Sequence, residues 1–313
     1  MEKEKIIIDC DPGVDDALAI ILALSSDKID LKAICSVSGN GSINTTTGNA
    51  LKILKLCNQE NIPVYKGAAV ALDNKQPKTV EAFGDDGLGG YAHTITSDKT
   101  EESQNAVDFL VDYINKNPKE ITLFAIGPCT NIALAIRKSS SFAKNLKRLI
   151  IMGGAKNTGN MSPVAEYNFW ADPQAASEVL SAGISDVTLI GLDVTNKIAL
   201  NCEMREIIRL QNTKLSEFVY NITKEGLDDN YKTRKKAVSP MHDVLTVAYF
   251  IDPSILECKQ VNVQVVVDGI AKGQSIIDIN GHWNKGICNA KYAANVDVDK
   301  FYKLFFEKIF KLN

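Results

Sequence analysis

Four aspartates near the amino terminus have types and spacing that could do chemistry. They follow the apolar run 6–8 and are Asp9, Asp11, Asp15 and Asp16. Asp9 and Asp11 share one face of a predicted strand, because side chains alternate there. Asp15 and Asp16 fall in the first turn of a predicted helix, where free amides favour anions. Helix capping accounts for one or two acids, but four close carboxylates repel one another, and an oxygen-preferring cation such as Ca²⁺ or Mg²⁺ would neutralise them.

Polar residues after later apolar runs could complete the same site. Asn40 lies in a tight Ser-Gly-Asn-Gly loop, and Thr130 offers a hydroxyl or a carbonyl at a predicted helix start. Glu166 and Asn168 are two residues apart, so an extended segment would direct both at one ligand. Each of them alone is a common turn residue, and they gain meaning only if the fold brings them to Asp11.

His242 and Asp243 form the last candidate pair. A histidine beside an aspartate is not a Ser-His-Asp triad, and the sequence lacks the GxSxG motif. The residues alone therefore leave a structural and a catalytic role for His242 open.

The elements that must position these residues alternate along the chain. Runs rich in Ile, Val and Leu predict buried strands at 5–11, 31–37, 121–126, 149–152 and 187–190. Apolar residues at three- and four-residue intervals predict helices at 17–24, 50–57 and 106–113. Such alternation implies an open α/β fold with a mainly parallel sheet flanked by helices. Ligands of these folds bind at the carboxyl ends of the strands, which the polar residues above follow.

The second half of the chain changes character. It predicts helices from Glu203 to about Gly226 and from Pro240 to Phe250, and a hairpin of 261–267 with 273–279 around Asp268-Gly269. A closing helix carries one apolar stripe, which predicts packing on the core rather than a membrane anchor; the stripe is Phe301, Leu304, Phe305, Ile309 and Leu312. No repeat or linker interrupts the sequence, so we expect a single domain over residues 1–313.

Composition narrows the possible partners. The 313 residues include 35 Lys or Arg and 38 Asp or Glu, a formal net charge of −3. A hydrophobic content of 45% can build a sizeable core and excludes a disordered chain. Because the net charge is close to zero, we expect no nucleic acid partner.

Cysteine usage and apolar runs predict the compartment. The seven cysteines lie far apart and form no CxxC pair, as is typical of reduced thiols in the cytoplasm. The most apolar run, 17–24, is far shorter than the roughly 18 residues of a membrane span. Asp9 ends the first apolar run too early for a secretory signal. We therefore expect a cytoplasmic protein with no membrane partner.

Six motifs, in order along the chain, resemble the nucleoside hydrolase family, the inosine–uridine preferring N-ribohydrolases. The most specific is the opening signature DxDPGxDDA, which residues 9–17 match. The others are Ser38-Gly39-Asn40, Gly127-Pro128-Cys129-Thr130-Asn131, Met152-Gly153-Gly154, the segment 165–173 and His242-Asp243. Together they span most of the chain, and six matches in order are not expected by chance.

The resemblance implies a Rossmann-like fold with a mixed, mainly parallel sheet. It also implies Ca²⁺-dependent hydrolysis of the N-glycosidic bond of ribonucleosides to free base and ribose, in nucleoside salvage, by a homodimer or homotetramer. The ligands of one Ca²⁺ would be Asp11, Asp16, the backbone carbonyl of Thr130 and Asp243. Asp11 would also act as general base on a water held by the metal.

By the same resemblance, the ribose hydroxyls would be held by Asp15, Asn160, Glu166 and Asn168. Met152 would line the pocket, Asn40 would lie near the metal and the attacking water, and His242 would protonate the departing base. Bond breaking builds positive charge on the ribose ring, which carboxylate and amide oxygens stabilise more in the transition state than in the ground state.

Base preference and three other functions stay open. Phe83 stands where many relatives carry a histidine beside the base. A phosphohydrolase of the haloacid dehalogenase type would use Asp9 or Asp11 as nucleophile with Mg²⁺, but would leave His242 and Asp243 without a role. A phosphorylase would require phosphate and release ribose 1-phosphate. A nucleoside-binding protein would show no turnover, although every expected metal and ribose residue is present.

Overall fold

A nine-stranded sheet organises the chain, with strand order β10-β9-β11-β6-β5-β4-β1-β2-β3. The computed structural model describes residues 3–79 and 83–310. The strands are β1 Glu4–Cys10, β2 Ile29–Ser36, β3 Val64–Lys66, β4 Thr122–Ala125, β5 Arg148–Met152, β6 Val187–Ile190, β9 Leu256–Val265, β10 Ser275–Asp278 and β11 Ala290–Val296. The run from β11 through β6 to β3 is parallel, whereas β9 is antiparallel to β10 and β11. The predicted mixed, mainly parallel sheet is therefore confirmed.

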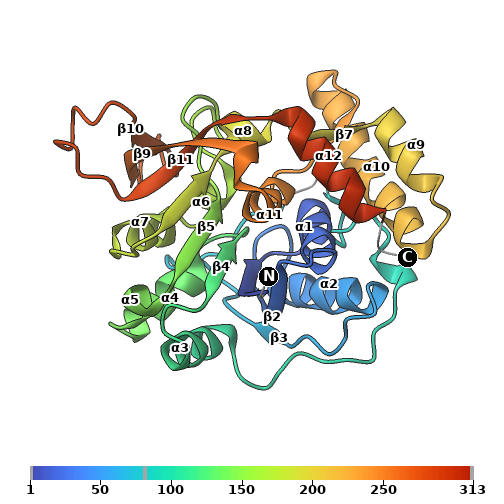
Figure 1. Cartoon of the computed structure of the whole chain (residues 1–313), viewed down its shortest axis with the longest axis horizontal. Coiled ribbons are helices and arrows are strands. Elements are labelled where there is room, and N and C mark those ends of the chain that lie inside the picture. The colour runs from blue at the N-terminus through green and yellow to red at the C-terminus, as the bar shows by residue number, and fades with distance from the viewer. Residues whose placement is uncertain (1–2, 80–82, 311–313) are drawn as a thin grey trace.

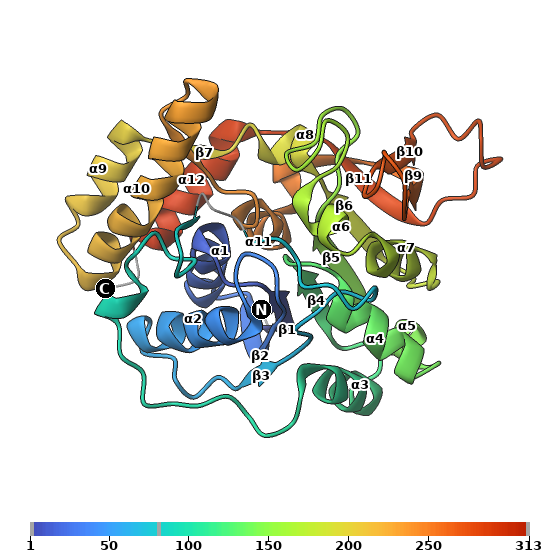
Figure 2. The ribbon, with the colours of Figure 1, turned by 180° about the vertical axis from the view of Figure 1, so that it is seen from behind.

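Helices cover both faces of this sheet (Figures 1 and 2). One face packs on α1 Val14–Leu24, α2 Ile43–Leu56, α11 Val244–Ile251 and α12 Val298–Ile309. The other packs on α3 Ala106–Lys116, α4 Thr130–Lys138, α5 Phe142–Asn145 and α7 Pro173–Ser181. Residues 6–8 of β1 are all apolar because both faces of the strand are buried. Ile6 and Ile8 pack in the core under α1 and α11, and Ile7 packs in the core on the other face. The three helices predicted in the first half are confirmed as α1, α2 and α3.

The second half departs from prediction at two helices. The helix expected from Glu203 to about Gly226 is two helices, α9 Cys202–Arg209 and α10 Lys214–Arg234. Asn212 takes a left-handed φ of 52°, and the Thr213 hydroxyl accepts a hydrogen bond from Ser216 N to begin α10. Pro240 ends strand β8 Val238–Pro240, which pairs with β7 Ala199–Asn201, so α11 begins later than predicted.

The carboxyl-terminal elements largely follow prediction. Strands β9 and β10 form the expected antiparallel hairpin, although β9 begins earlier, at Leu256. Along α12 the side chains of Phe301, Phe305 and Ile309 are buried on the core, while Leu312 lies outside the described residues. In the described part of the chain, no helix combines the length and apolarity that a membrane crossing needs.

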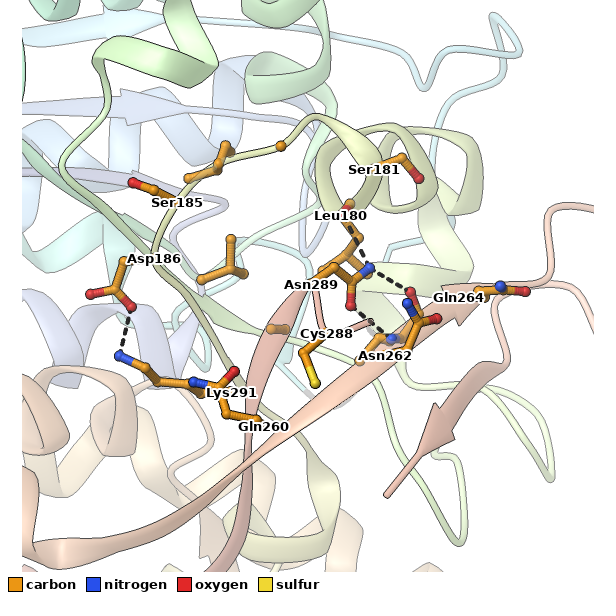
Figure 3. A pocket seen from close by; sticks show the side chains of 15 residues that line it. Leu180, Ser181, Ser185, Asp186, Gln260, Asn262, Gln264, Cys288, Asn289 and Lys291 are labelled. Atoms are coloured by element: carbon orange, nitrogen blue, oxygen red, sulfur yellow. Dashed lines mark hydrogen bonds and ion pairs between the residues drawn. The ribbon is translucent and has the colours of Figure 1, made fainter. Parts of the chain in front are cut away.

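The antiparallel end of the sheet contains a cavity of about 540 Å³ between the α7–β6 connection, β9 and β11 (Figure 3). Two of its polar side chains, Asn289 and Lys291, form hydrogen bonds or ion pairs with neighbouring protein groups. Asn289 donates to Leu180 O and Val263 O and accepts from Val263 N, and Lys291 Nζ lies 2.9 Å from Asp186 Oδ1. The residues described around this cavity include none of the predicted site residues.

Candidate active site

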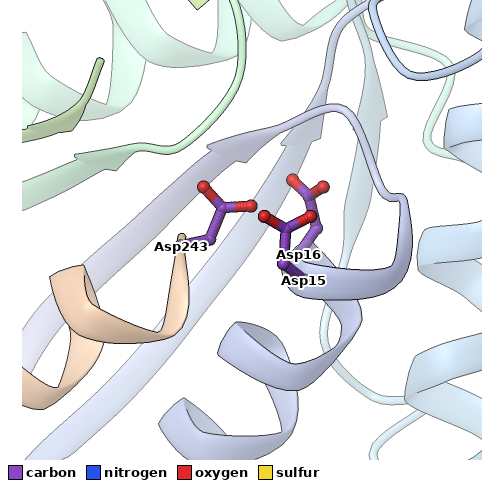
Figure 4. Close-up of side chains that lie close together, drawn as sticks. All are labelled: Asp15, Asp16 and Asp243. Carbon is purple, nitrogen blue, oxygen red and sulfur yellow. The ribbon is translucent and has the colours of Figure 1, made fainter. Parts of the chain in front are cut away.

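Aspartates from two distant segments meet where β1 ends. Asp15 and Asp16 lie in the first turn of α1, and Asp243 directly precedes α11 (Figure 4). All three are buried, and one carboxylate oxygen from each lies within 4.8 Å of the other two. The predicted metal set contained Asp16 and Asp243 but placed Asp15 on the ribose. The geometry shows that Asp15 is an equal member of this cluster.

Asn40 joins Asp11 to the cluster. Its backbone N donates to Asp11 Oδ2 at 2.7 Å, and its Nδ2 donates to Asp16 Oδ2 at 3.0 Å. Asp11 N and Gly13 N also donate to the Asp16 carboxylate, at 3.2 and 3.0 Å. Gly39 must be glycine because a Cβ there would lie 2.0 Å from Asp11 Oδ2. The backbone N–H and the side-chain NH₂ group of Asn40 thus both donate to the acids. Asn40 therefore lies next to the position predicted for the metal and the water.

Burial and mutual repulsion dominate the electrostatics of this acidic cluster. Burial and the nearby Asp16 raise the pKa of Asp11 well above its usual range. Burial raises the pKa of Asp15 to about 6, and burial together with Asp15 raises the pKa of Asp16 to about 8. Burial raises the pKa of Asp243 strongly, and its charged neighbours that add to the shift are all acidic. Among the described residues, no lysine or arginine forms an ion pair with these carboxylates. Such a set of buried acids is the donor set that a hard cation such as Ca²⁺ or Mg²⁺ neutralises.

Asp9 does not join the cluster, contrary to the prediction that it shares a face with Asp11. Strand β1 ends at Cys10, so the alternation of side chains no longer relates Asp11 to Asp9. Asp9 instead accepts from Asn131 Nδ2 at 2.8 Å. Its Oδ1 has no hydrogen-bond partner among the described residues, and burial raises its pKa to about 7.

Thr130 begins α4, beside the cluster. Gly127, three residues earlier, contacts Asp11 so closely that a Cβ there would lie 2.7 Å from Asp11 Oδ1. The Thr130 hydroxyl donates to Asp172 Oδ2 at 2.8 Å. Of the two groups that the sequence offered as a ligand, the hydroxyl is therefore already engaged, and the carbonyl remains.

A cavity of about 220 Å³ opens onto these acids. It is lined by residues predicted for catalysis, substrate or metal, which are Asp11, Asp15, Asn40, Met152, Asn160, Glu166, Asn168, His242 and Asp243. The other two predicted metal ligands, Asp16 and Thr130, are buried and do not line it. The cavity therefore brings together residues from five of the six motifs singled out in the sequence, and Gly127 of the sixth contacts Asp11.

Glu166 and Asn168 form one wall of the cavity. Glu166 precedes helix α6 Tyr167–Ala171, and its carboxylate accepts from Gly154 N, Asn168 N and Phe169 N. Burial raises the pKa of Glu166 to about 7 against the effect of these amides. Asn168 Nδ2 donates to Ile126 O and Met152 O, both at 3.1 Å. The segment is helical rather than extended as predicted, and with its donors engaged Asn168 has Oδ1 left to accept a ligand hydroxyl.

His242 is far along the chain from Glu166 and Asn168 but lines the same cavity. Its Nδ1 lies 2.8 Å from the hydroxyl oxygen of Thr195, at the end of α8 Leu192–Thr195. Burial and the positive charge of Arg234 lower the pKa of His242 to about 4. The imidazole is therefore neutral at pH 7.

Helix α10 contributes a wall that sequence reasoning largely missed. Its residues along the cavity are Gly226, Asp229, Asn230 and Arg234. Residues at such intervals share one face of a helix, which is the only sequence signal for this wall. The same pattern is found on any polar, solvent-exposed helix face, so it does not identify a cavity wall. Phe83 also lines the cavity, as expected of a residue beside the base, and packs on Gly13, where a Cβ would lie 2.8 Å from its ring.

Known proteins resemble this chain in sequence and in overall structure. The sequence profile of the inosine-uridine preferring nucleoside hydrolases matches residues 6–303. The inosine-uridine preferring nucleoside hydrolase of Leishmania major is 33% identical, covering 97% of each chain. The pyrimidine-specific ribonucleoside hydrolase RihB of Escherichia coli O157:H7 is 34% identical over 97% of this chain and 96% of its own.

A solved structure extends this likeness to three dimensions. The purine-preferring ribonucleoside hydrolase from Gardnerella vaginalis is 32% identical, covers 99% of both chains and superposes with a TM-score of 0.93. Its similarity includes the mixed central sheet and the helices around it. With a profile match over nearly all of its length and relatives above 30% identity, this chain belongs to the inosine-uridine preferring nucleoside hydrolase family, a family of metal-dependent enzymes.

Proposed function

We propose that this protein is a Ca²⁺-dependent ribonucleoside hydrolase that releases free base and ribose. The observation that carries the proposal is the buried acidic cluster opening onto a cavity lined by Glu166, Asn168 and His242. The ligand atoms that the cluster offers are carboxylate oxygens, which fit Ca²⁺ better than a softer metal. A phosphohydrolase using Asp9 as nucleophile finds no support, because Asp9 is bonded to Asn131 and does not line the cavity.

The ion would be held by Asp11, Asp16, Asp243 and the carbonyl of Thr130. When bound, it would lower the pKa of a water and orient it toward the sugar. Asp15 lies in the cluster and also lines the cavity, so we propose that it binds a ribose hydroxyl next to the cation.

Asp11 is the proposed general base. It lines the cavity, and Asn40 N fixes its Oδ2, so its other oxygen can accept a proton from the attacking water. Glu166, Asn168 and Asn160 would hold the ribose hydroxyls. Their oxygens, with Asp15, would stabilise the positive charge that develops on the ring as the glycosidic bond breaks.

His242 is the proposed donor to the leaving base. It is neutral at pH 7, so it carries one ring N–H. When the Thr195 hydroxyl donates to Nδ1, the proton lies on Nε2, which can then donate to the departing base. A hydrogen bond from this neutral imidazole stabilises the negative charge that develops on the departing base and so lowers the barrier to its departure.

The relatives differ in the base for which they are named. The relatives above are named for inosine and uridine, for pyrimidines and for purines, so we propose purine nucleosides, pyrimidine nucleosides or both as substrates, in nucleoside salvage.

We further propose one domain over residues 1–313 in a cytoplasmic homodimer or homotetramer. The cysteines support a reducing compartment, since all seven are unbonded.

The deciding experiment measures base and ribose released from inosine, adenosine, guanosine, uridine and cytidine in phosphate-free buffer, with Ca²⁺ and after chelation. Ca²⁺-dependent release of free ribose is expected, and the ranking supplies the preferred base. Turnover only after phosphate is added would identify a phosphorylase. No turnover despite tight nucleoside binding would identify a binding protein, and cleavage of a generic phosphate ester with Mg²⁺ would contradict the assignment.

A further inference from the structure

Thr130 is the only proposed metal ligand that would act through its main chain. Its carbonyl cannot be placed by a side-chain rotamer, so its position depends on what holds the backbone around it. The α4 helix that starts here has no side-chain cap from Cys129 in the described structure. The bonds that hold this segment therefore come from other elements, and they involve three motif residues to which the proposed function gives no role: Asp9, Asn131 and Asp172.

Asp172 holds Thr130 from one side. Its side chain is buried, and its Oδ2 accepts from the Thr130 hydroxyl and from Leu72 N, both at 2.8 Å. Its Oδ1 accepts from Ala175 N at 3.0 Å and so caps α7. Asp172 thereby ties the start of α4 to the start of α7 through hydrogen bonds to one buried carboxyl group.

Asn131 holds the next residue from the other side. Its buried Nδ2 donates to Asp9 Oδ2 at 2.8 Å and to Ser36 O at 3.0 Å. Its Oδ1 accepts from Ala68 N at 2.8 Å. The side chain is packed so closely that a Cβ on Gly67 would lie 2.3 Å from its Oδ1. Asn131 thus ties α4 to the ends of β1 and β2.

We propose that Asp172 is a positioning residue of the metal site, which acts through the Thr130 hydroxyl to set the place of the Thr130 carbonyl, with Asn131 and Asp9 holding the following residue. The inference rests on the proposed function, because it takes this carbonyl to be a ligand. Neither Asp172 nor the Thr130 hydroxyl lines the cavity, so the effect belongs to cation binding rather than to substrate contact. Loss of a group that orients a metal ligand typically weakens metal binding by about 10–100-fold.

The test measures Ca²⁺ dissociation constants of the full chain by calorimetry after removal of metal, with the melting temperature of the metal-free protein as a control for folding. Thr130→Val removes the hydroxyl and keeps the size and the carbonyl, while Thr130→Ser keeps the hydroxyl. Thr246→Val is the matched control, because Thr246 is buried and its hydroxyl has no partner among the described residues. Asp172→Asn is a second variant that leaves Thr130 intact.

Thr130→Val and Asp172→Asn are expected to weaken Ca²⁺ binding by about 10-fold or more, whereas Thr130→Ser and Thr246→Val stay within about threefold of the parent. Unchanged affinity in both Thr130→Val and Asp172→Asn would overturn the positioning role. An equal loss in Thr130→Ser or in Thr246→Val would also overturn it, since the hydroxyl bond would not be the cause. If the parent protein itself binds no Ca²⁺, the proposed function fails instead, which separates the two conclusions.

Discussion

At the scale of single residues, Asp11 has the most demanding position. It is buried, receives a hydrogen bond from Asn40 and lines the cavity. Asp11→Ala would remove a cation ligand and the general base together, so we expect turnover of every nucleoside to fall by at least about 10³-fold. Steady-state assays with saturating Ca²⁺ check this, and Asp98→Ala, a change at an exposed aspartate, serves as the control. Substantial activity in Asp11→Ala would remove Asp11 from the mechanism.

His242 calls for a comparison of leaving groups. His242→Ala should lower kcat/KM for inosine by about 10²-fold or more, because the base then leaves without its hydrogen-bond donor. Hydrolysis of a nitrophenyl riboside, whose phenolate leaves without protonation, should change far less. Thr195→Val should show a milder loss of the same pattern, since it removes the hydroxyl that contacts Nδ1. Equal losses on both kinds of substrate in His242→Ala would instead indicate a structural role.

At the scale of elements, the short helix α8 supports two parts of the site. Thr195 contacts His242, and Asp193 anchors the loop that carries Asn160. The Asp193 carboxylate accepts from Lys156 N at 2.7 Å and from Asn157 N at 3.1 Å, and also from the Tyr292 hydroxyl. The loop over the cavity is therefore held at its base by a helix of only four residues.

Asp193→Asn should loosen this loop. We expect KM for nucleosides to rise by about fivefold to tenfold, because the ordering of Asn160 is lost before the sugar binds, and kcat to change less. Tyr292→Phe is the matched variant, since it removes one bond to Asp193 and leaves those to the loop. KM and kcat measured for both variants check the prediction. A rise in KM for Tyr292→Phe equal to that for Asp193→Asn would show that the loop bonds are not responsible.

At the scale of the whole molecule, the acidic cluster links stability to pH and Ca²⁺. The pKa of Asp15 is raised to about 6 and that of Asp16 to about 8, from an ordinary value near 4. In the metal-free protein the folded state therefore holds protons that the unfolded chain has already released. The contribution of Asp15 and Asp16 to stability is therefore fully present below about pH 4 and is lost as the pH rises through 6 and 8.

Two measurements of the melting temperature test this direction of the pH dependence. The melting temperature of the metal-free protein should fall between pH 5 and pH 8.5. Added Ca²⁺ should raise the melting temperature more at pH 8 than at pH 5.5, because the cation binds ionised carboxylates and only to the folded state. Asp243→Asn should reduce both effects. A metal-free protein equally stable at both pH values would mean that these carboxyls do not titrate with folding.

Local chemistry in the sequence determined the fold class and most of the site. Apolar runs predicted β1, β2, β4, β5 and β6 to within two residues, because a strand covered on both faces must be apolar throughout. The four acids from Asp9 to Asp16 indicated a cation for an equally local reason, since so many charges within a short segment need a partner.

Only the tertiary structure decided which distant groups meet. It placed Asp15 beside Asp243. It also placed the Thr195 hydroxyl, 47 residues earlier in the chain, next to the ring of His242. Asp9 accepts a hydrogen bond from Asn131 and does not join the cluster. The tertiary structure also separated α9 from α10 and set α10 against the cavity. These outcomes depend on how helices and loops pack across the end of the sheet, and a local pattern of residues carries no information about the side chain that will face it from another element.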